Sequence, residues 1–180
     1  MPFTPYHFGP NAFFAFFFRR WIDIPVFILA NVIVDVEVLF ATGWSPHRYW
    51  HWHSLLIGAV IGIIWGLAAY PLRNLFKKIM KLLRIPYETN MKKMVISGVL
   101  GLWTHVIFDS IYHYDVQPFW PYTKNPLWKL GKLNLTQDQT KMICTLFMVA
   151  AILIYVSILQ TYAKKKKVQD ARQAAENRTS

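Results

Sequence analysis

Three ionisable side chains recur at every fourth position in one apolar stretch of this chain. His105, Asp109 and His113 lie within residues 101–115, and at 3.6 residues per turn this spacing places them on one face of a helix. An imidazole and a carboxylate one turn apart can hold a metal ion together, or one can orient the other. Ionisable groups in a membrane-grade segment usually mark a functional site. The alternative is a buried polar network that joins helices.

The composition indicates a membrane protein. Of the 180 residues, 54% are hydrophobic and 16% are charged, whereas about a quarter of the residues of a soluble domain are charged. The single cysteine, Cys144, excludes an intrachain disulfide and a metal site built mainly on thiolates. The N-terminus lacks a basic segment followed by a cleavage site, so we expect mature sequence there and not a signal peptide.

The apolar runs predict an all-α fold, a multi-pass membrane helical bundle. Residues 5–18 are too short for the roughly 20 residues that a span needs, so they predict a short N-terminal helix. We expect Ser54 to cap the second full span. Four longer runs predict full transmembrane helices over residues 22–40, 54–72, 94–114 and 142–163.

Two further segments complete the predicted domain organisation. Residues 73–93 are basic and amphipathic, a pattern typical of helices that lie along lipid headgroups. Residues 1–163 are therefore expected to form one membrane-embedded domain with an outward-facing His/Asp cluster. Residues 164–180 are expected to form a basic, disordered cytoplasmic tail.

The distribution of positive charge predicts the orientation. Seven basic residues lie in 73–93, six follow residue 163, and Arg19 and Arg20 bring the total to fifteen of the twenty lysines and arginines. By the positive-inside rule these segments and the C-terminus are cytoplasmic. Topology and anionic lipid thus account for the net charge of +11, and we expect no nucleic-acid partner.

This orientation gathers the ionisable groups in the outer half of the bilayer. The first full span runs outward, the second runs inward and the third runs outward, so their polar ends meet on the outer side. If the N-terminal helix also begins outside, all six histidines share this layer. The groups concerned are His7, Asp35, Glu37, His47, His51, His53, His105, Asp109, His113 and Asp115.

Imidazoles and carboxylates without thiolates suit zinc, manganese or iron. We expect a divalent metal ion, zinc foremost, as one or two ions with an open position for water. His53, His105 and Asp109 are the first expected ligands, and Asp35 or Glu37 would serve as ligand or general base. Groups beyond these would orient the ligands.

The order of several short motifs resembles that of a known family, the YdjM-like inner-membrane metal-dependent hydrolases. The motifs are Thr4-Pro-x-His7, Asp35-x-Glu37, a His-Arg segment that ends in His-Ser over residues 47–54, Thr104-His-x-x-x-Asp109 and Pro118-Phe-Trp-Pro121, and the resemblance covers roughly residues 1–130. It implies functional roles for His7, Asp35, Glu37, one or two of His47, His51 and His53, and His105 with Asp109.

The chain departs from the family's pattern at two places. The family's second acid is usually aspartate, whereas this chain has Glu37. Its central motif usually reads His-Arg-x-x-Thr-His-Ser, and residues 47–54 contain one residue more. Whether His47 or His51 acts with His53 therefore stays open.

These observations predict a metal-dependent hydrolase of the inner membrane. We expect it to cleave an ester or phosphoester bond, including one in a lipid, at the outer face of the membrane, with Asp35, Glu37 and Asp109 as the candidate catalytic carboxylates. The alternatives are a metal or proton transporter and a non-enzymatic membrane partner protein. Residues 54–72 and 142–163 offer few polar groups for a relay across the membrane, which favours a site on one side only.

Overall fold

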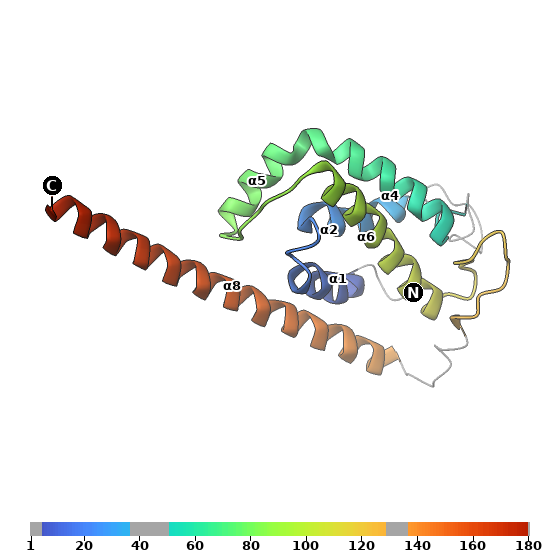
Figure 1. Cartoon of the computed structure of the whole chain (residues 1–180). Helices are drawn as coiled ribbons and strands as arrows, with labels where there is room; N and C mark the ends of the chain where they lie inside the picture. The colour runs from blue at the N-terminus through green and yellow to red at the C-terminus, as the bar shows by residue number, and fades with distance from the viewer. Residues whose placement is uncertain (1–4, 37–50, 129–136, 180) are drawn as a thin grey trace.

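Helices make up the regular structure of the described part of the chain, which confirms the predicted all-α class (Figure 1). The computed structural model describes residues 5–36, 51–128 and 137–179. Its elements are α1 (Pro5–Phe17), α2 (Ile24–Val34), α4 (Leu55–Ala69), the short 3-10 helix η2 (Tyr70–Leu72), α5 (Arg73–Leu82), α6 (Met91–Tyr112) and α8 (Gln137–Thr179).

Three helical segments are long and apolar enough to cross a membrane, namely Leu55–Leu82, Met91–Ile111 and Lys141–Ala174. They contain most of the predicted spans 54–72, 94–114 and 142–163. The span predicted over residues 22–40 is represented by α2, whose 11 residues rise only about 16 Å. Residues 37–40 lie outside the described part. Three of the four predicted full spans are therefore found among the described residues, and the fourth is not confirmed.

The first two helices form an antiparallel hairpin. Asp23 caps α2, where its side chain accepts a hydrogen bond from the backbone N–H of Val26, and Pro25 occupies the first turn, where a proline is tolerated. Midway along the hairpin, the buried Asn11 amide donates to the Asn31 side-chain oxygen at 2.8 Å. This bond fixes the register of α1 against α2, and α2 packs in turn against α6.

Small residues allow α4 and α6 to pack closely. Gly58, Gly62 and Gly66 are the buried glycines of α4, one turn apart, and they line the face turned toward α6. A Cβ atom added at Gly62 would lie 2.6 Å from the Cα atom of Val99. Such close backbone approach is the usual basis of helix association in membranes, where apolar side chains gain little from leaving lipid.

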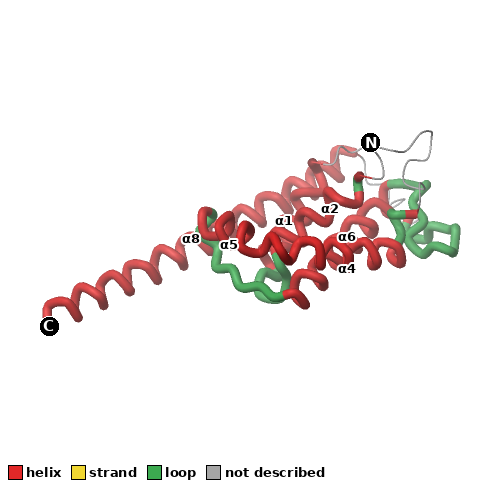
Figure 2. The backbone as a smooth tube through the Cα atoms, turned by 90° about the horizontal axis from the view of Figure 1, so that it is seen from above, coloured by secondary structure: helices red, strands yellow, loops and turns green. Residues whose placement is uncertain are grey.

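The loop that precedes α6 and the loop that follows it lie at opposite ends of the bundle (Figure 2). At the end where α6 begins, Asp23 is fully buried and joins three segments. Its carboxylate accepts hydrogen bonds from the hydroxyls of Tyr87 and Thr89, and its backbone N–H donates to the Ser97 hydroxyl. The predicted amphipathic segment begins as α5, which follows α4 and η2 directly and buries Phe76 and Met80.

The longest helix, α8, packs along α1 and then extends beyond the other helices (Figure 1). It runs without interruption for 43 residues, to Thr179. The prediction of a disordered tail from residue 164 therefore differs from the structure, in which residues 164–179 are helical. Lysine, alanine, glutamine, arginine and glutamate dominate this stretch, and all are strong helix formers that can extend an existing helix.

Candidate metal centre

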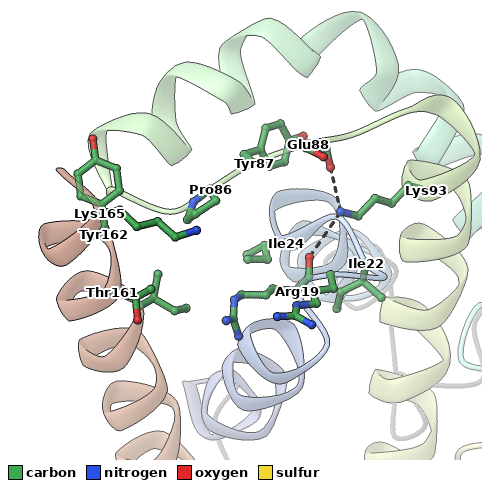
Figure 3. A pocket seen from close by; sticks show the side chains of 12 residues that line it. Arg19, Ile22, Ile24, Pro86, Tyr87, Glu88, Lys93, Thr161, Tyr162 and Lys165 are labelled. Carbon is green, nitrogen blue, oxygen red and sulfur yellow. Dashed lines mark hydrogen bonds between the residues drawn. The ribbon is translucent and has the colours of Figure 1, made fainter. Parts of the chain in front are cut away.

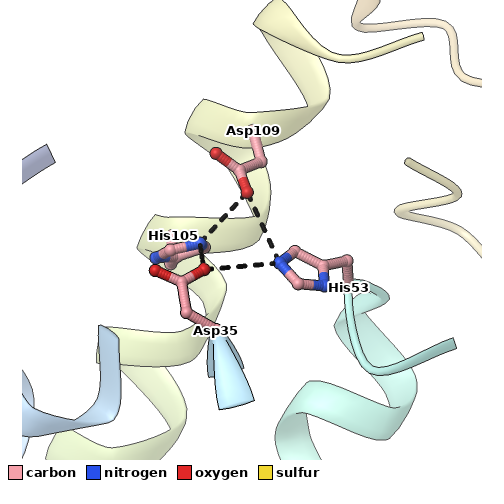
Figure 4. Close-up of side chains that lie close together, drawn as sticks. All are labelled: Asp35, His53, His105 and Asp109. Carbon is pink, nitrogen blue, oxygen red and sulfur yellow. Dashed lines mark hydrogen bonds and ion pairs between the residues drawn. The ribbon is translucent and has the colours of Figure 1, made fainter. Parts of the chain in front are cut away.

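Two imidazoles and two carboxylates converge at the end of the bundle where α6 finishes (Figure 4). One ligand atom from each of Asp35, His53, His105 and Asp109 lies within 4.8 Å of the others. Asp35 is the last-turn cap of α2, His53 immediately precedes the cap of α4, and the other two lie one turn apart on α6. Three segments that are distant in the sequence thus contribute to one cluster.

The short distances in this cluster join the Nε2 atom of each histidine to a carboxylate oxygen. The Nε2 atom of His105 lies 3.0 Å from Oδ2 of Asp109 and 3.1 Å from Oδ1 of Asp35. The Nε2 atom of His53 lies 3.4 Å from the same Asp109 oxygen and 3.8 Å from the same Asp35 oxygen. Each imidazole therefore faces both carboxylates through a single nitrogen.

These separations allow one metal ion to contact all four side chains. Zinc binds imidazole nitrogen and carboxylate oxygen at about 2.0–2.2 Å, which places neighbouring ligand atoms roughly 3.3 Å apart in a tetrahedron. The four measured nitrogen–oxygen separations, 3.0 to 3.8 Å, bracket that value. A set of two nitrogens and two oxygens also suits zinc, iron or manganese, so the residues fit the ion that the sequence predicts.

Burial makes a cation favourable at this site. His53 and His105 are each 1% exposed and Asp109 is 2% exposed, and two carboxylates this close repel each other when both are ionised. Buried charges in proteins are paired or bind metals. Asp35 differs, since its side chain is 26% exposed. Access to the cluster therefore lies on the Asp35 side.

Local interactions hold His53 in place. As predicted, Ser54 caps α4, and its hydroxyl accepts from the Ile57 N–H and donates to the His51 carbonyl. The backbone N–H of Leu55 donates to the carbonyl of Pro118 at 2.8 Å. The Trp103 indole N–H donates to the Leu55 carbonyl at 2.9 Å. The start of α4 is thus hydrogen-bonded both to α6 and to the loop that follows α6.

The end of α6 is held in a similar way. The backbone N–H of His113 donates to the carbonyl of Asp109 at 2.7 Å, and His113 then leaves the helix in an extended conformation. The side-chain amide of Asn125 donates to the carbonyls of Ser110 and His113. This closure fixes the last turn of α6, from which Asp109 projects.

The structure brings together four of the eight predicted metal ligands. His51 is described but is not part of the cluster, because its ring stacks on Trp120 at a centroid distance of 4.9 Å. Glu37 and His47 lie outside the described residues. His7 lies in the first turn of α1, and its side chain is outside the described part. His113, which is half-buried, is also not in the cluster.

The buried Asn11–Asn31 pair was not recognised from the sequence as part of the surroundings of this site. Asn31 lies one helical turn before Asp35, and Asn11 is paired to it. The sequence does contain a sign of this pair. One asparagine lies four residues after His7 and another lies four residues before Asp35, each within an apolar segment. The sequence shows the spacing of each asparagine from its neighbouring site residue. It does not show that the two asparagines pair, because that depends on how the helices pack.

Comparison with protein families gave a match over residues 22–168 to the family described as YdjM inner membrane protein. This match confirms the resemblance drawn from the motif order and includes all four clustered residues. It extends further toward the C-terminus than the motifs do, and it begins after His7. Comparison with curated proteins and with solved structures gave no match.

Proposed function

Because this chain belongs to the YdjM family of inner-membrane proteins, we propose that it is a membrane-bound metal-dependent hydrolase. The observation that supports this proposal is the convergence of Asp35, His53, His105 and Asp109 within 4.8 Å in a buried site. The substrate class is an ester or phosphoester, including one in a lipid, cleaved at the outer face of the membrane.

The four residues divide into two roles by their exposure. His53, His105 and Asp109 are buried and fixed by neighbouring helices, so they would hold a divalent ion, with zinc as the first candidate. A bound ion of this kind acts as a Lewis acid and supplies a water-derived nucleophile near neutral pH. Asp35 is partly exposed and can act as a fourth ligand or as the general base that accepts a proton from water.

His7 is the first candidate for a further ligand. The Asn11–Asn31 bond sets the register of the α1–α2 hairpin. Residue 7 lies one turn before Asn11 and residue 35 lies one turn after Asn31, so antiparallel packing places positions 7 and 35 at the same level of the bundle. We propose that His7 completes the site or orients Asp35, as the motif order implied.

The distribution of buried polar groups favours a one-sided site over a transporter. In the described part of the chain, one group of them lies around Asp35 and Asn31 and another lies around Asp23. Asp23 and Asn31 are eight positions apart, a rise of about 12 Å, and the buried residues between them include Val26, Phe27 and Ala30. This apolar layer interrupts a proton or metal path along α2.

The outward orientation of the site follows from charge. Lys93, in the first turn of α6, and Asp109 near its end are separated by 16 residues, or roughly 24 Å of helix. The cationic segments around Arg19, Arg20 and α5 lie at the Lys93 end. The positive-inside rule then assigns that end and the C-terminus to the cytoplasm, and the metal centre to the outer face.

The test is hydrolysis by the purified full chain in lipid nanodiscs. The probes are a carboxylic ester, a phosphomonoester, a phosphodiester and a phospholipid, each measured with and without added zinc. We expect turnover of at least one probe that a chelator abolishes and that Asp35→Asn reduces by 100-fold or more, the size typical of a lost general base. His113→Ala changes a residue outside the cluster and is the control, which should retain most of the activity when zinc is saturating.

Two results would contradict the proposal. Metal-independent turnover would show that the cluster is not the reaction centre. Tight metal binding with no turnover of any probe, together with metal uptake into sealed vesicles, would favour the transporter instead.

A further inference from the structure

A second site lies at the end of the bundle opposite the metal centre. A cavity of about 480 Å³ opens there between the α1–α2 connection, the segment that precedes α6, and α8 (Figure 3). Its lining includes Ile22 from the connection and Ile24 from the start of α2, Lys93 from the first turn of α6, and Ile158 and Lys165 from α8. The site is therefore built by three separate segments of the chain.

The chemistry of this cavity is apolar at depth and cationic at its rim. Ile22, Ile24 and Ile158 are each at most 6% exposed and supply the apolar wall. Four cations, Arg19, Arg20, Lys93 and Lys165, line the same cavity with one carboxylate, that of Glu88. Within the described part of the chain, none of these four cations forms an ion pair with a carboxylate.

Backbone carbonyls position one of these cations. The ammonium group of Lys93 donates to the carbonyl of Glu88 at 2.9 Å and lies 3.5 Å from the carbonyl of Arg19 (Figure 3). These contacts orient the lysine, and its charge also interacts with the nearby carboxylates of Asp23 and Glu88. The guanidinium of Arg19 likewise contacts a carbonyl, that of Phe16, at 3.3 Å. The three other cations, Arg19, Arg20 and Lys165, leave the lining with an excess of positive charge that an anion can neutralise.

The cavity continues into a cationic groove between α5 and α8. A neighbouring cavity of about 550 Å³ shares Pro86, Tyr87 and Lys165 with the first one. Its other cations are Lys77, Lys81, Arg84 and Lys166, and its carboxylate is that of Asp170. Across both cavities eight cations face two carboxylates.

We infer that this cavity binds the phosphate-bearing headgroup of an anionic phospholipid. Basic pockets between transmembrane helices bind such headgroups, and arginine binds phosphate oxygens through two parallel hydrogen bonds. The isoleucine wall suits the glycerol and the first acyl carbons, which a free phosphate lacks. The site is independent of the proposed hydrolase activity, because it shares no residue with the metal centre.

The experiment measures lipid retained by the full chain after detergent extraction. Wild-type protein, the triple variant Arg19→Gln/Arg20→Gln/Lys165→Gln and a control triple variant Lys78→Gln/Lys92→Gln/Lys164→Gln are exchanged into mixed phosphatidylglycerol and phosphatidylcholine, and bound lipid is counted by native mass spectrometry. The control removes the same charge at exposed positions outside both cavities. A second variant, Lys165→Gln, alters one exposed side chain. It tests the same cavity even if the triple variant does not fold.

We expect retained phosphatidylglycerol to fall by tenfold or more in the cavity triple variant and about fivefold in Lys165→Gln, since each cation near an anionic lipid contributes roughly that factor. The control triple variant should retain phosphatidylglycerol within twofold of the wild-type amount. Neither the wild type nor any variant should retain phosphatidylcholine. Equal loss in both triple variants would overturn the inference in favour of diffuse charge attraction. Displacement of the lipid by millimolar inorganic phosphate would overturn it in favour of a free-phosphate site.

Discussion

His53 lies just before α4 and Asp109 lies on α6, yet the Nε2 atom of the imidazole and the Oδ2 atom of the carboxylate are 3.4 Å apart. This relationship depends on how closely α4 approaches α6. The glycines of α4 permit that approach, because backbone atoms of α6 occupy the space that a side chain at Gly62 would need. The helix contact and the metal centre are therefore linked, and a change in the first should be measurable in the second.

A methyl group at Gly62 should separate the two helices. The Cβ atom of Gly62→Ala would meet backbone atoms of Val99 and Gly98 at 2.6–2.8 Å, and overpacking of this kind costs about 1–3 kcal/mol. We expect a lower melting temperature in detergent and zinc affinity reduced by about 10–100-fold, as for a misoriented ligand.

Gly58→Ala is the matched control for this prediction, because its Cβ atom would meet its neighbours at ordinary contact distances of 3.8–4.0 Å. Both variants add one methyl group to the same face of α4. Equal behaviour of the two would show that close helix packing does not position His53.

The network around Asp23 predicts a pH dependence of stability. Burial, with the adjacent Asp23 carboxylate that accepts its hydrogen bond at 2.6 Å, raises the pKa of the Tyr87 phenol above its usual range. A group whose pKa is higher in the folded state than in the unfolded state stabilises the fold. This stabilisation is fully present below the pKa of the unfolded state, about 10, and is lost as the pH rises through the pKa of the folded state.

We therefore expect Tyr87→Phe to lower the unfolding free energy at pH 8 by about 1.5–3 kcal/mol, the contribution of a hydrogen bond to a charged group. The difference from wild type should shrink above about pH 10. Chemical denaturation in detergent at pH 8 and pH 11 measures both values, with the exposed Tyr122→Phe as control. A difference that stays constant between the two pH values would argue against the Tyr87–Asp23 bond as its source.

The orientation is tested by labelling single cysteines in intact cells. In a Cys144→Ser background, a cysteine in place of the exposed Tyr122 should react with an impermeant thiol reagent. Cysteines in place of the exposed residues Lys78 and Lys166 should react only after lysis. Labelling at position 78 without lysis would reverse the orientation and place the metal centre on the cytoplasmic side.

The sequence predicted much of the site because its chemistry follows helical spacing. His105 and Asp109 lie one turn apart on a helix whose length and apolarity were recognisable, and the predicted orientation of the spans gathered Asp35 and His53 in the same outer layer. His53 was among the first expected ligands, but whether His47 or His51 acts with it could not be decided in advance. For His51 the outcome is a matter of tertiary structure. It depends on the loop after α6, where Trp120 stacks on His51 and the Pro118 carbonyl binds the start of α4.

The fold was less predictable where local composition and context disagree. The lysine-rich C-terminus has too little apolar surface to fold alone, which predicted disorder, but it continues from a span as part of α8. The α1–α2 hairpin is set by Asn11 and Asn31, and the α4–α6 contact is set by glycines against backbone. Such pairings between helices are not encoded in the spacing within one helix.

The most direct test of the metal centre is the zinc content of three variants after loading, desalting and elemental analysis. His105→Ala and Asp109→Ala each remove a buried ligand, so we expect wild-type protein to retain about one ion per chain and these two variants to retain almost none. His113→Ala removes a residue outside the cluster and should weaken binding by no more than about 10–100-fold. If His113→Ala empties the site while His105→Ala stays loaded, the metal binds at the surface, and His105 with Asp109 serves only helix packing.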